Sequence, residues 1–251
     1  MSLLRFGLAV AAAALLVQAD PVGAAELKIF GSRVTKVMIG ELGPAYEQAS
    51  GHKLTVSADV AAVTKRRIEA GESFDVAVLV NFQTDDLIKT GKVVADTRAD
   101  IMKSGIGVAV KKGALRPDIS TVEAFKQTLL NAKSITYLKE GASTIHLDKI
   151  FAQLGIADAI RDKTIKTTGE EVSENVASGV AEIGIIVVPN IMSVPGADLV
   201  GPLPAEINSY IMFTAGVSAA SPNQAAAREI IRLMQSPEAL RVMKANGMEP
   251  G

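Results

Sequence analysis

The chain has 251 residues, of which 48% are hydrophobic and 21% are charged, so it can bury the core of one or two globular domains. Lys and Arg number 26 against 27 Asp and Glu, and the net charge of -1 leaves no excess of positive charge for nucleic-acid phosphates, so we expect no nucleic-acid partner. Because the chain has no cysteine, disulfides, thiolate catalysis and cysteine-ligated zinc are excluded.

The first residues differ in composition from the rest. Arg5 precedes the apolar run FGLAVAAAALLV, and Asp20-Pro21 ends that run before the small residues at 23–25. The run is shorter than the roughly 20 residues that cross a bilayer, which argues against a membrane anchor. We predict that residues 1–25 are a signal peptide cleaved after Ala25, and that the mature protein is exported to the periplasm.

Short apolar runs then alternate with helix-like segments. Strands are predicted at 27–31, 53–58 and 75–80, with helices between them at 34–50 and 60–70. The run DVAVLV at 75–80 is typical of a strand buried on both faces of a parallel sheet. In this βαβαβ order, right-handed crossovers place both helix N-termini at the carboxyl edge of one sheet.

A second α/β set follows. Strands are predicted at 106–110, 134–138, 182–188 and 210–217, and helices at 120–130, 143–154 and 170–178, with two more after Ser221-Pro222 and Ser236-Pro237. Ser120 and Glu123 are spaced as a capping box, and VGPLPAE is a Pro-rich bridge. We expect two α/β lobes with a cleft between them; the alternative is a single doubly wound domain.

Three strand-to-helix joints have the features of an anion site. They are Gly31-Ser32-Arg33, residues 59–62 with Ala61 and Ala62, and residues 140–144 with Ser143 and Thr144. Ligands of open α/β sheets bind outside the carboxyl ends of strands, where helix N-termini favour negative charge. Arg33 could direct two N–H groups at a carboxylate. The alternative for Ser32, Ser143 and Thr144 is a plain helix N-cap.

Other polar residues give weaker signals. Asn81 follows a buried strand and either reaches the cleft or forms a turn. Residues 65–67, Lys-Arg-Arg, are typical of a solvated helix face. His52 is expected in an exposed turn, whereas His146 lies in the first turn of a predicted helix and could carry a proton. The sequence contains no Walker loop, dinucleotide fingerprint or G-x-S-x-G elbow.

Three stretches resemble a known family over essentially the whole mature chain: ELKIFGSRVTKVMIGELGPAYEQASGHKLTV, RRIEAGESFDVAVL and SPEALRVMKANGMEP. They are similar to the bacterial periplasmic solute-binding proteins grouped with molybdate-binding proteins. The resemblance implies an α/β, type II periplasmic binding fold, with lobe one at 26–104 and 211–251 and lobe two at 105–210. It also implies a monomer without cofactor or metal, which closes over a small anion and passes it to an ABC transporter permease.

The site residues that the resemblance implies match only in part. The first serine of the molybdate site falls on Ser32, but its second serine falls in the stretch Val60-Ala61-Ala62 and is missing. A tyrosine of the family falls around Val187 and Val188 and is missing too. With Arg33 beside Ser32, these departures favour an organic carboxylate over molybdate. The predicted ligand-binding residues are Ser32, Arg33, Ala61, Ala62, Asn81, Ser143, Thr144 and Val188.

The stretches TRADIMKSGIGVAV, PDISTVEAFK and KEGAS also resemble one branch of this family, which includes periplasmic enzymes that interconvert trans- and cis-aconitate. Such an isomerase needs clamps for three carboxylates and a base that moves an allylic proton. His146, Glu140 and Tyr137 are the unranked candidates for the base. Our primary hypothesis remains a solute-binding protein, with the isomerase as the alternative and a receptor without a transporter as a third possibility.

Overall fold

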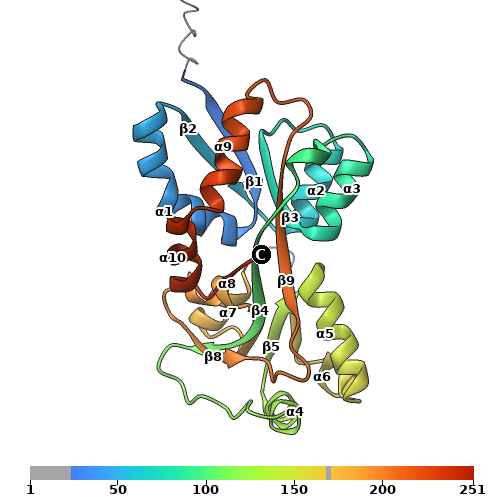
Figure 1. Ribbon diagram of the computed structural model, residues 1–251. Helices are drawn as coiled ribbons and strands as arrows, with labels where there is room; N and C mark the ends of the chain where they lie inside the picture. Colours follow the sequence, from blue (N-terminus) through green and yellow to red (C-terminus); the bar gives the residue numbers. More distant parts are fainter. Residues whose placement is uncertain (1–23, 168–170) are drawn as a thin grey trace, which may run out of the picture.

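The protein folds into two lobes, one above the other, with the C-terminus between them (Figure 1). The computed structural model describes residues 24–167 and 171–251. The predicted signal peptide, apart from Ala24 and Ala25, lies outside these residues. Of the helices in the described ranges, none is long and apolar enough to cross a membrane.

Lobe one is built on three parallel strands. β1 (Glu26–Gly31) lies between β2 (Lys53–Ala58) and β3 (Val76–Val80), and the following helices are α1 (Arg33–Ser50), α2 (Ala61–Glu69) and α3 (Asn81–Lys89). Every residue of β3 is buried, which confirms the interpretation of its apolar run. The parallel order also places the starts of all three helices beyond the carboxyl ends of the strands.

Lobe two repeats this arrangement around a second parallel set. β5 (Ile135–Leu138) lies between β6 (Thr164–Thr167) and β7 (Ile183–Val187). The helices are α4 (Val122–Asn131), α5 (Ala142–Gln153), α6 (Ala157–Arg161), α7 (Val172–Ser178) and α8 (Val188–Met192), and β8 (Ala197–Pro202) pairs with the crossing strand described next.

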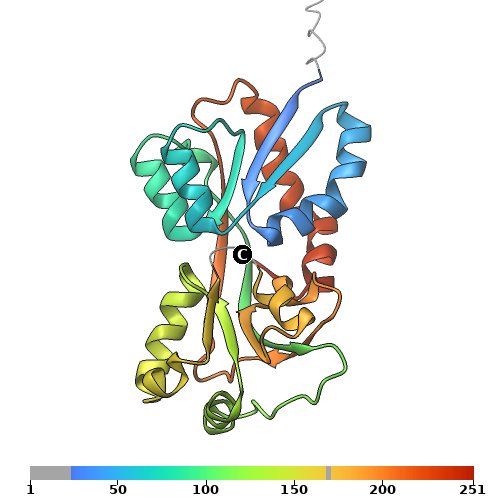
Figure 2. The ribbon, with the colours of Figure 1, turned by 180° about the vertical axis from the view of Figure 1, so that it is seen from behind.

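Two long strands connect the lobes, as both views show (Figures 1 and 2). β4 (Ala99–Lys111) pairs with β9 (Tyr210–Val217) as far as Gly105 and with β7 from Ile106 onward, so one sheet runs through both lobes in the order β2-β1-β3-β9-β4-β7-β5-β6. The boundary between lobes at residues 104 and 105 stays a prediction, and this change of partner favours it.

The C-terminal residues return to lobe one and then to the crossing strands. After the short 3-10 turn η1 (Ala95–Thr97) and β9 come α9 (Gln224–Met234), α10 (Pro237–Ala245) and β10 (Glu249–Pro250), which pairs with β4. Ser236 caps α10 as predicted, since its hydroxyl accepts a hydrogen bond from the Ala239 N–H at 3.2 Å. The N-cap of α9 is Asn223, so Ser221-Pro222 lies before that helix.

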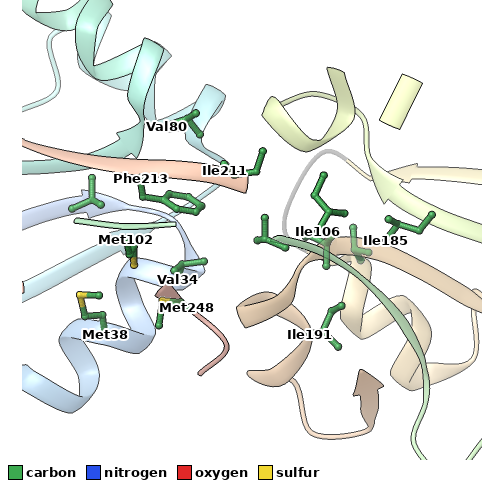
Figure 3. Close-up of a cluster of buried hydrophobic side chains, with 14 of the residues drawn as sticks. Val34, Met38, Val80, Met102, Ile106, Ile185, Ile191, Ile211, Phe213 and Met248 are labelled. Carbon is green, nitrogen blue, oxygen red and sulfur yellow. The ribbon is translucent and has the colours of Figure 1, made fainter. Parts of the chain in front are cut away.

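One apolar core passes from lobe to lobe (Figure 3). Val34 and Met102 belong to its part in lobe one, and Ile106 and Ile185 to its part in lobe two. Phe213 lies on β9, between β3 and β4 in the sheet. Full burial of one such side chain contributes about 1.5–3 kcal/mol. The lobes therefore share one continuous apolar core beneath the cleft.

Several expectations about local structure were wrong. The helices α3, α6 and α8 and the strands β6 and β8 were not predicted, and β4 is much longer than 106–110. The N-cap of α4 is Thr121, whose hydroxyl accepts from the Ala124 N–H at 3.1 Å, so Ser120 does not start a capping box. His52 is only 4% exposed, because its Nδ1 accepts from the Ala25 N–H at 3.1 Å and its ring lies beside Tyr46.

Candidate functional site

A cavity of about 50 Å³ lies between the lobes, where the carboxyl ends of the parallel strands of both lobes meet. Five of its lining residues are helix N-caps: Ser32 of α1, Val60 of α2, Val80 of α3, Gly141 of α5 and Val187 of α8. In the described part of the chain, none of these five makes a side-chain hydrogen bond to its own helix.

This convergence sets the electrostatics of the cavity. The first N–H groups of a helix have no partner within the helix, and the helix dipole places partial positive charge at the same end. Several such ends around one small space favour a negatively charged group there. The cavity is therefore suited to an anion, although no described residue of its lining carries a charged side chain.

The neutral polar residues Ser32, Ser143 and Asn190 also line the cavity. Ser32 is 6% exposed and Asn190 is 4% exposed, and within the described residues neither the Ser32 Oγ nor the Asn190 Oδ1 has a hydrogen-bond partner. A buried polar atom left without a partner costs about 1–3 kcal/mol. Ser32 lies on lobe one and Asn190 on lobe two, so a ligand that bonds both would join the lobes.

The remaining wall is mostly apolar. Val34 and Val80 contribute from lobe one, Ile186 from lobe two, and Ile211 and Phe213 from β9. Figure 3 shows Phe213 and Ile211 on one stretch of β9, with Ile211 nearer to lobe two. A bare tetrahedral oxyanion offers no hydrocarbon for such a wall, whereas an organic acid does.

Among the described residues, the ion pairs Arg33–Glu174 and Arg66–Glu140 join the lobes beside the cavity. The Arg33 guanidinium of α1 lies 2.5 Å from the Glu174 carboxylate of α7. The Arg66 guanidinium of α2 donates two hydrogen bonds, of 3.0 and 2.8 Å, to the carboxylate of Glu140 in the loop between β5 and α5. These bonds hold the pKa of Glu140 below its ordinary range. Arg66 lies on an exposed helix face, as expected, and it also connects the lobes.

The structure brings some of the predicted ligand residues to the cavity and leaves others beside it. Ser32, Ala61 and Ser143 line it. Ala62 and Val188 each follow a lining residue, the Asn81 side chain accepts from the Phe82 N–H at 2.8 Å, and the Thr144 hydroxyl donates to the Leu138 carbonyl at 2.9 Å. Arg33 is engaged with Glu174. Ligand contact by all of these residues stays a prediction.

The three candidate bases have partners of their own. Glu140 binds Arg66, the His146 Nε2 lies 2.8 Å from the Ile207 carbonyl oxygen, and the Tyr137 hydroxyl donates to Asp148 at 3.0 Å. Burial, with the Asp148 carboxylate nearby, raises the pKa of Tyr137. Of the described residues around the cavity, none is one of these three or any other titratable group.

Sequence reasoning missed Asn190 and Glu174. Asn190 lies one turn after the buried strand β7, at the same kind of strand-to-helix joint as Ser32 and Ser143. The strand predicted at 182–188 was expected to end before Pro189, but Pro also suits the first turn of a helix, and that is its place in α8. Glu174 gave no signal of its own, because its partner Arg33 is on the other lobe.

Comparison with known proteins agrees with this architecture. Residues 27–249 match the family described as bacterial extracellular solute-binding protein. A protein named aconitate isomerase, from a Pseudomonas species, is 32% identical over 247 residues, which are 94% of this chain and 94% of that protein.

Solved structures show the same fold at low identity. The periplasmic molybdate-binding protein of Azotobacter vinelandii superposes with a TM-score of 0.76 at 16% identity, covering 90% of this chain and 99% of that one. The sulfate-binding protein of Mycobacterium tuberculosis gives a TM-score of 0.72 at 15% identity, covering 90% and 87%. At this identity the likeness establishes the two-lobed fold alone.

Proposed function

The chain belongs to the bacterial extracellular solute-binding proteins, and on that premise we propose that it captures a small organic carboxylate between its lobes for an ABC importer. One observation carries the proposal: five helix N-termini from both lobes converge on one cavity that also has an apolar wall. The helix ends suit a carboxylate group, and the wall suits the carbon skeleton that bears it.

The departures from a molybdate site support the same ligand class. Ala61 lines the cavity where the molybdate-type site would have a hydroxyl, and Val187 lines it where a tyrosine would stand. Both substitutions remove donors from a tetrahedral oxyanion and add apolar surface. The protein would act as a periplasmic monomer, without cofactor or metal, after loss of its signal peptide, and would deliver its ligand to a membrane permease.

A thermal-shift panel tests this proposal. The protein is heated with molybdate, tungstate, sulfate, citrate, cis-aconitate or trans-aconitate. A ligand present at 100 times its Kd adds about 2.7 kcal/mol to the stability of the native state, so at least one organic acid should raise the Tm clearly. Molybdate, tungstate and sulfate should raise it less. A panel in which no anion raises the Tm would remove the proposal.

A matched variant separates binding in the cavity from a general salt effect. Ala61→Glu places a carboxylate at the first position of α2, where negative charge suits the helix. The variant should fold, yet the new charge should repel an anionic ligand and abolish the shift. An undiminished shift in this variant would place the ligand elsewhere.

Isomerisation of aconitate is the second candidate, favoured by the 32% identity to the Pseudomonas protein of that name along nearly the whole chain. Incubation with trans-aconitate, followed by NMR for the cis isomer, tests it. Because no titratable side chain of the described residues lines the cavity, we expect no conversion. Conversion would instead establish the isomerase, and Glu140→Gln, His146→Gln and Tyr137→Phe would then rank the three candidate bases.

A further inference from the structure

Asn190 is the least explained polar residue of the cavity. Its backbone carbonyl accepts a hydrogen bond from the Ser193 hydroxyl at 3.1 Å, whereas its side-chain amide makes no hydrogen bond to any residue in the described ranges. The side chain is buried and lines the cavity. By contrast, the buried hydroxyl of Thr144 and the buried ring of His52 both have partners inside the protein. The cavity is therefore the place where the Asn190 amide can find one.

The element that carries Asn190 is held firmly. Ile191 beside it is fully buried in the core, and Val188 packs so closely against the C-terminal segment that a Cβ on Gly247 would lie 2.5 Å from it. Gly107 of β4 allows the same close approach on the other side, since a Cβ there would lie 3.0 Å from Val188. The amide is thus presented by a fixed element rather than by a loop, which suits recognition.

The chemistry of the amide differs from that of the helix ends. Helix N-termini offer only N–H donors, which satisfy the oxygens of a carboxylate. An asparagine amide offers two donors and a carbonyl acceptor, and the acceptor needs a donor on the ligand. A fully ionised carboxylic acid has acceptor oxygens alone. A ligand that satisfies both the helix ends and the amide carbonyl needs a hydrogen-bond donor as well, and a hydroxyl group on the acid supplies one.

We propose that Asn190 is a specificity-determining residue that binds a hydroxyl group of the ligand, so that the protein prefers a hydroxycarboxylate to the same acid without its hydroxyl. The inference rests on the proposed capture of a carboxylate between the lobes. The Ser32 hydroxyl, on the opposite lobe, lies in the same cavity and can bond the carboxylate or the hydroxyl of the same ligand. The neutral side chains of Asn190 and Ser32 would then distinguish among acids that bind equally well to the helix N-termini.

Titration calorimetry with matched acids tests the proposal. Citrate is compared with tricarballylate and malate with succinate, each pair differing by one hydroxyl, and trans-aconitate joins the acids without one. We expect the hydroxy acid of at least one pair to bind the wild-type protein about tenfold more tightly. Equal affinities within both pairs, or a preference for the acid without the hydroxyl, would overturn the inference. If no carboxylate binds at all, the proposed function itself fails.

Two variants assign the preference to the amide. In Asn190→Ala, the hydroxy acid should bind only as tightly as the matched acid without the hydroxyl. The affinity for that matched acid should change by less than about twofold. Asn190→Asp keeps an acceptor but adds negative charge, so both acids should weaken while the preference for the hydroxyl survives. A preference that persists in Asn190→Ala, or disappears in Asn190→Asp when binding can still be measured, would contradict the role given to Asn190.

Discussion

Asp75 connects β1 to the segment between β9 and α9. It does so through a single buried carboxylate. Its Oδ2 accepts from the Lys28 N–H at 2.8 Å, and its Oδ1 accepts from the Ser221 hydroxyl at 2.5 Å and from the Asn223 amide at 3.3 Å. Ser221 was predicted to open a helix, and its hydroxyl instead binds this carboxylate. A buried charge is tolerated because donors surround it.

Asp75→Ala should therefore destabilise the fold. The substitution leaves two buried or half-buried donors and one backbone N–H without their acceptor, and we expect the free energy of unfolding to fall by about 2–4 kcal/mol in urea titrations. Asp158→Ala is the control, because that carboxylate is 86% exposed and pairs only with Arg161 of the same helix. Equal stability of the two variants would contradict the role given to Asp75.

Arg33 pairs with Glu174, and a ligand carboxylate would be a further partner for its guanidinium. If the ligand competes for the guanidinium, Arg33→Ala should cost about 1.5–3 kcal/mol of binding free energy, measured by calorimetry. Glu174→Gln should have the opposite effect and tighten binding, because it releases Arg33 from its ion pair. Unchanged affinity in both variants would place Arg33 outside the site and leave it as a link between lobes.

Elements with a strong pattern were predictable, and short ones were not. β3 is buried at all five positions, and its apolar run alone gave the strand. β8 is half-buried at almost every position, so no alternation of apolar and polar residues indicated it. The five-residue helix α8 begins with Val-Pro directly after β7, and an apolar run of that kind does not distinguish the end of a strand from the start of a helix.

The contact between α8 and the C-terminal segment gives a prediction for one element. Gly247 has a φ of 68°, and an added Cβ would lie 2.5 Å from Val188 and 2.9 Å from the Met192 sulfur. Gly247→Ala should lower the Tm, with a loss of about 1–3 kcal/mol from strain and overpacking. Gly40→Ala, in the middle of α1 with nothing within 4 Å, should raise stability by about 0.5–1 kcal/mol instead. A rise in the Tm of both variants would contradict the tight packing around Gly247.

At the scale of the whole molecule, the position of the cavity was predictable from the sequence. The contacts that hold the two lobes together beside it were not. The joints at Ser32, Ala61 and Ser143 were found because helix starts follow strand ends in sequence, and all three line the cavity. Arg66 and Glu140 lie 74 residues apart and on different lobes. No local pattern relates two exposed charges across a cleft, since their pairing depends on how the lobes meet.

The pair between Arg66 and Glu140 makes closure sensitive to pH. Because the pair lowers the pKa of Glu140 in the bridged form, its contribution to closure is complete above the ordinary carboxyl pKa and is lost as the pH falls through the lowered value. The radius of gyration of the ligand-free protein, measured by small-angle scattering, should rise as the pH falls below about 4.3 while far-UV circular dichroism still reports a folded chain.

Arg67, next to Arg66 in the sequence, supplies the control for this pH effect. Arg66→Ala should be more open than the wild-type protein at neutral pH and show a smaller further change on acidification. Arg67 pairs with Glu72 inside lobe one, so Arg67→Ala should keep the pH-dependent opening of the wild-type protein. A loss of that opening in Arg67→Ala, or its persistence in Arg66→Ala, would assign closure to other contacts.

Helices that begin at the cavity without a capping side chain have a consequence for the stability of the protein. Val60, Val80 and Val187 occupy positions where Ser, Thr, Asn or Asp would each add about 1 kcal/mol to the stability of a helix. A lineage selected for heat resistance alone would install those residues, and each would fill the cavity with its own oxygen. Laboratory evolution for thermostability without ligand should therefore yield more stable descendants that no longer bind the ligand.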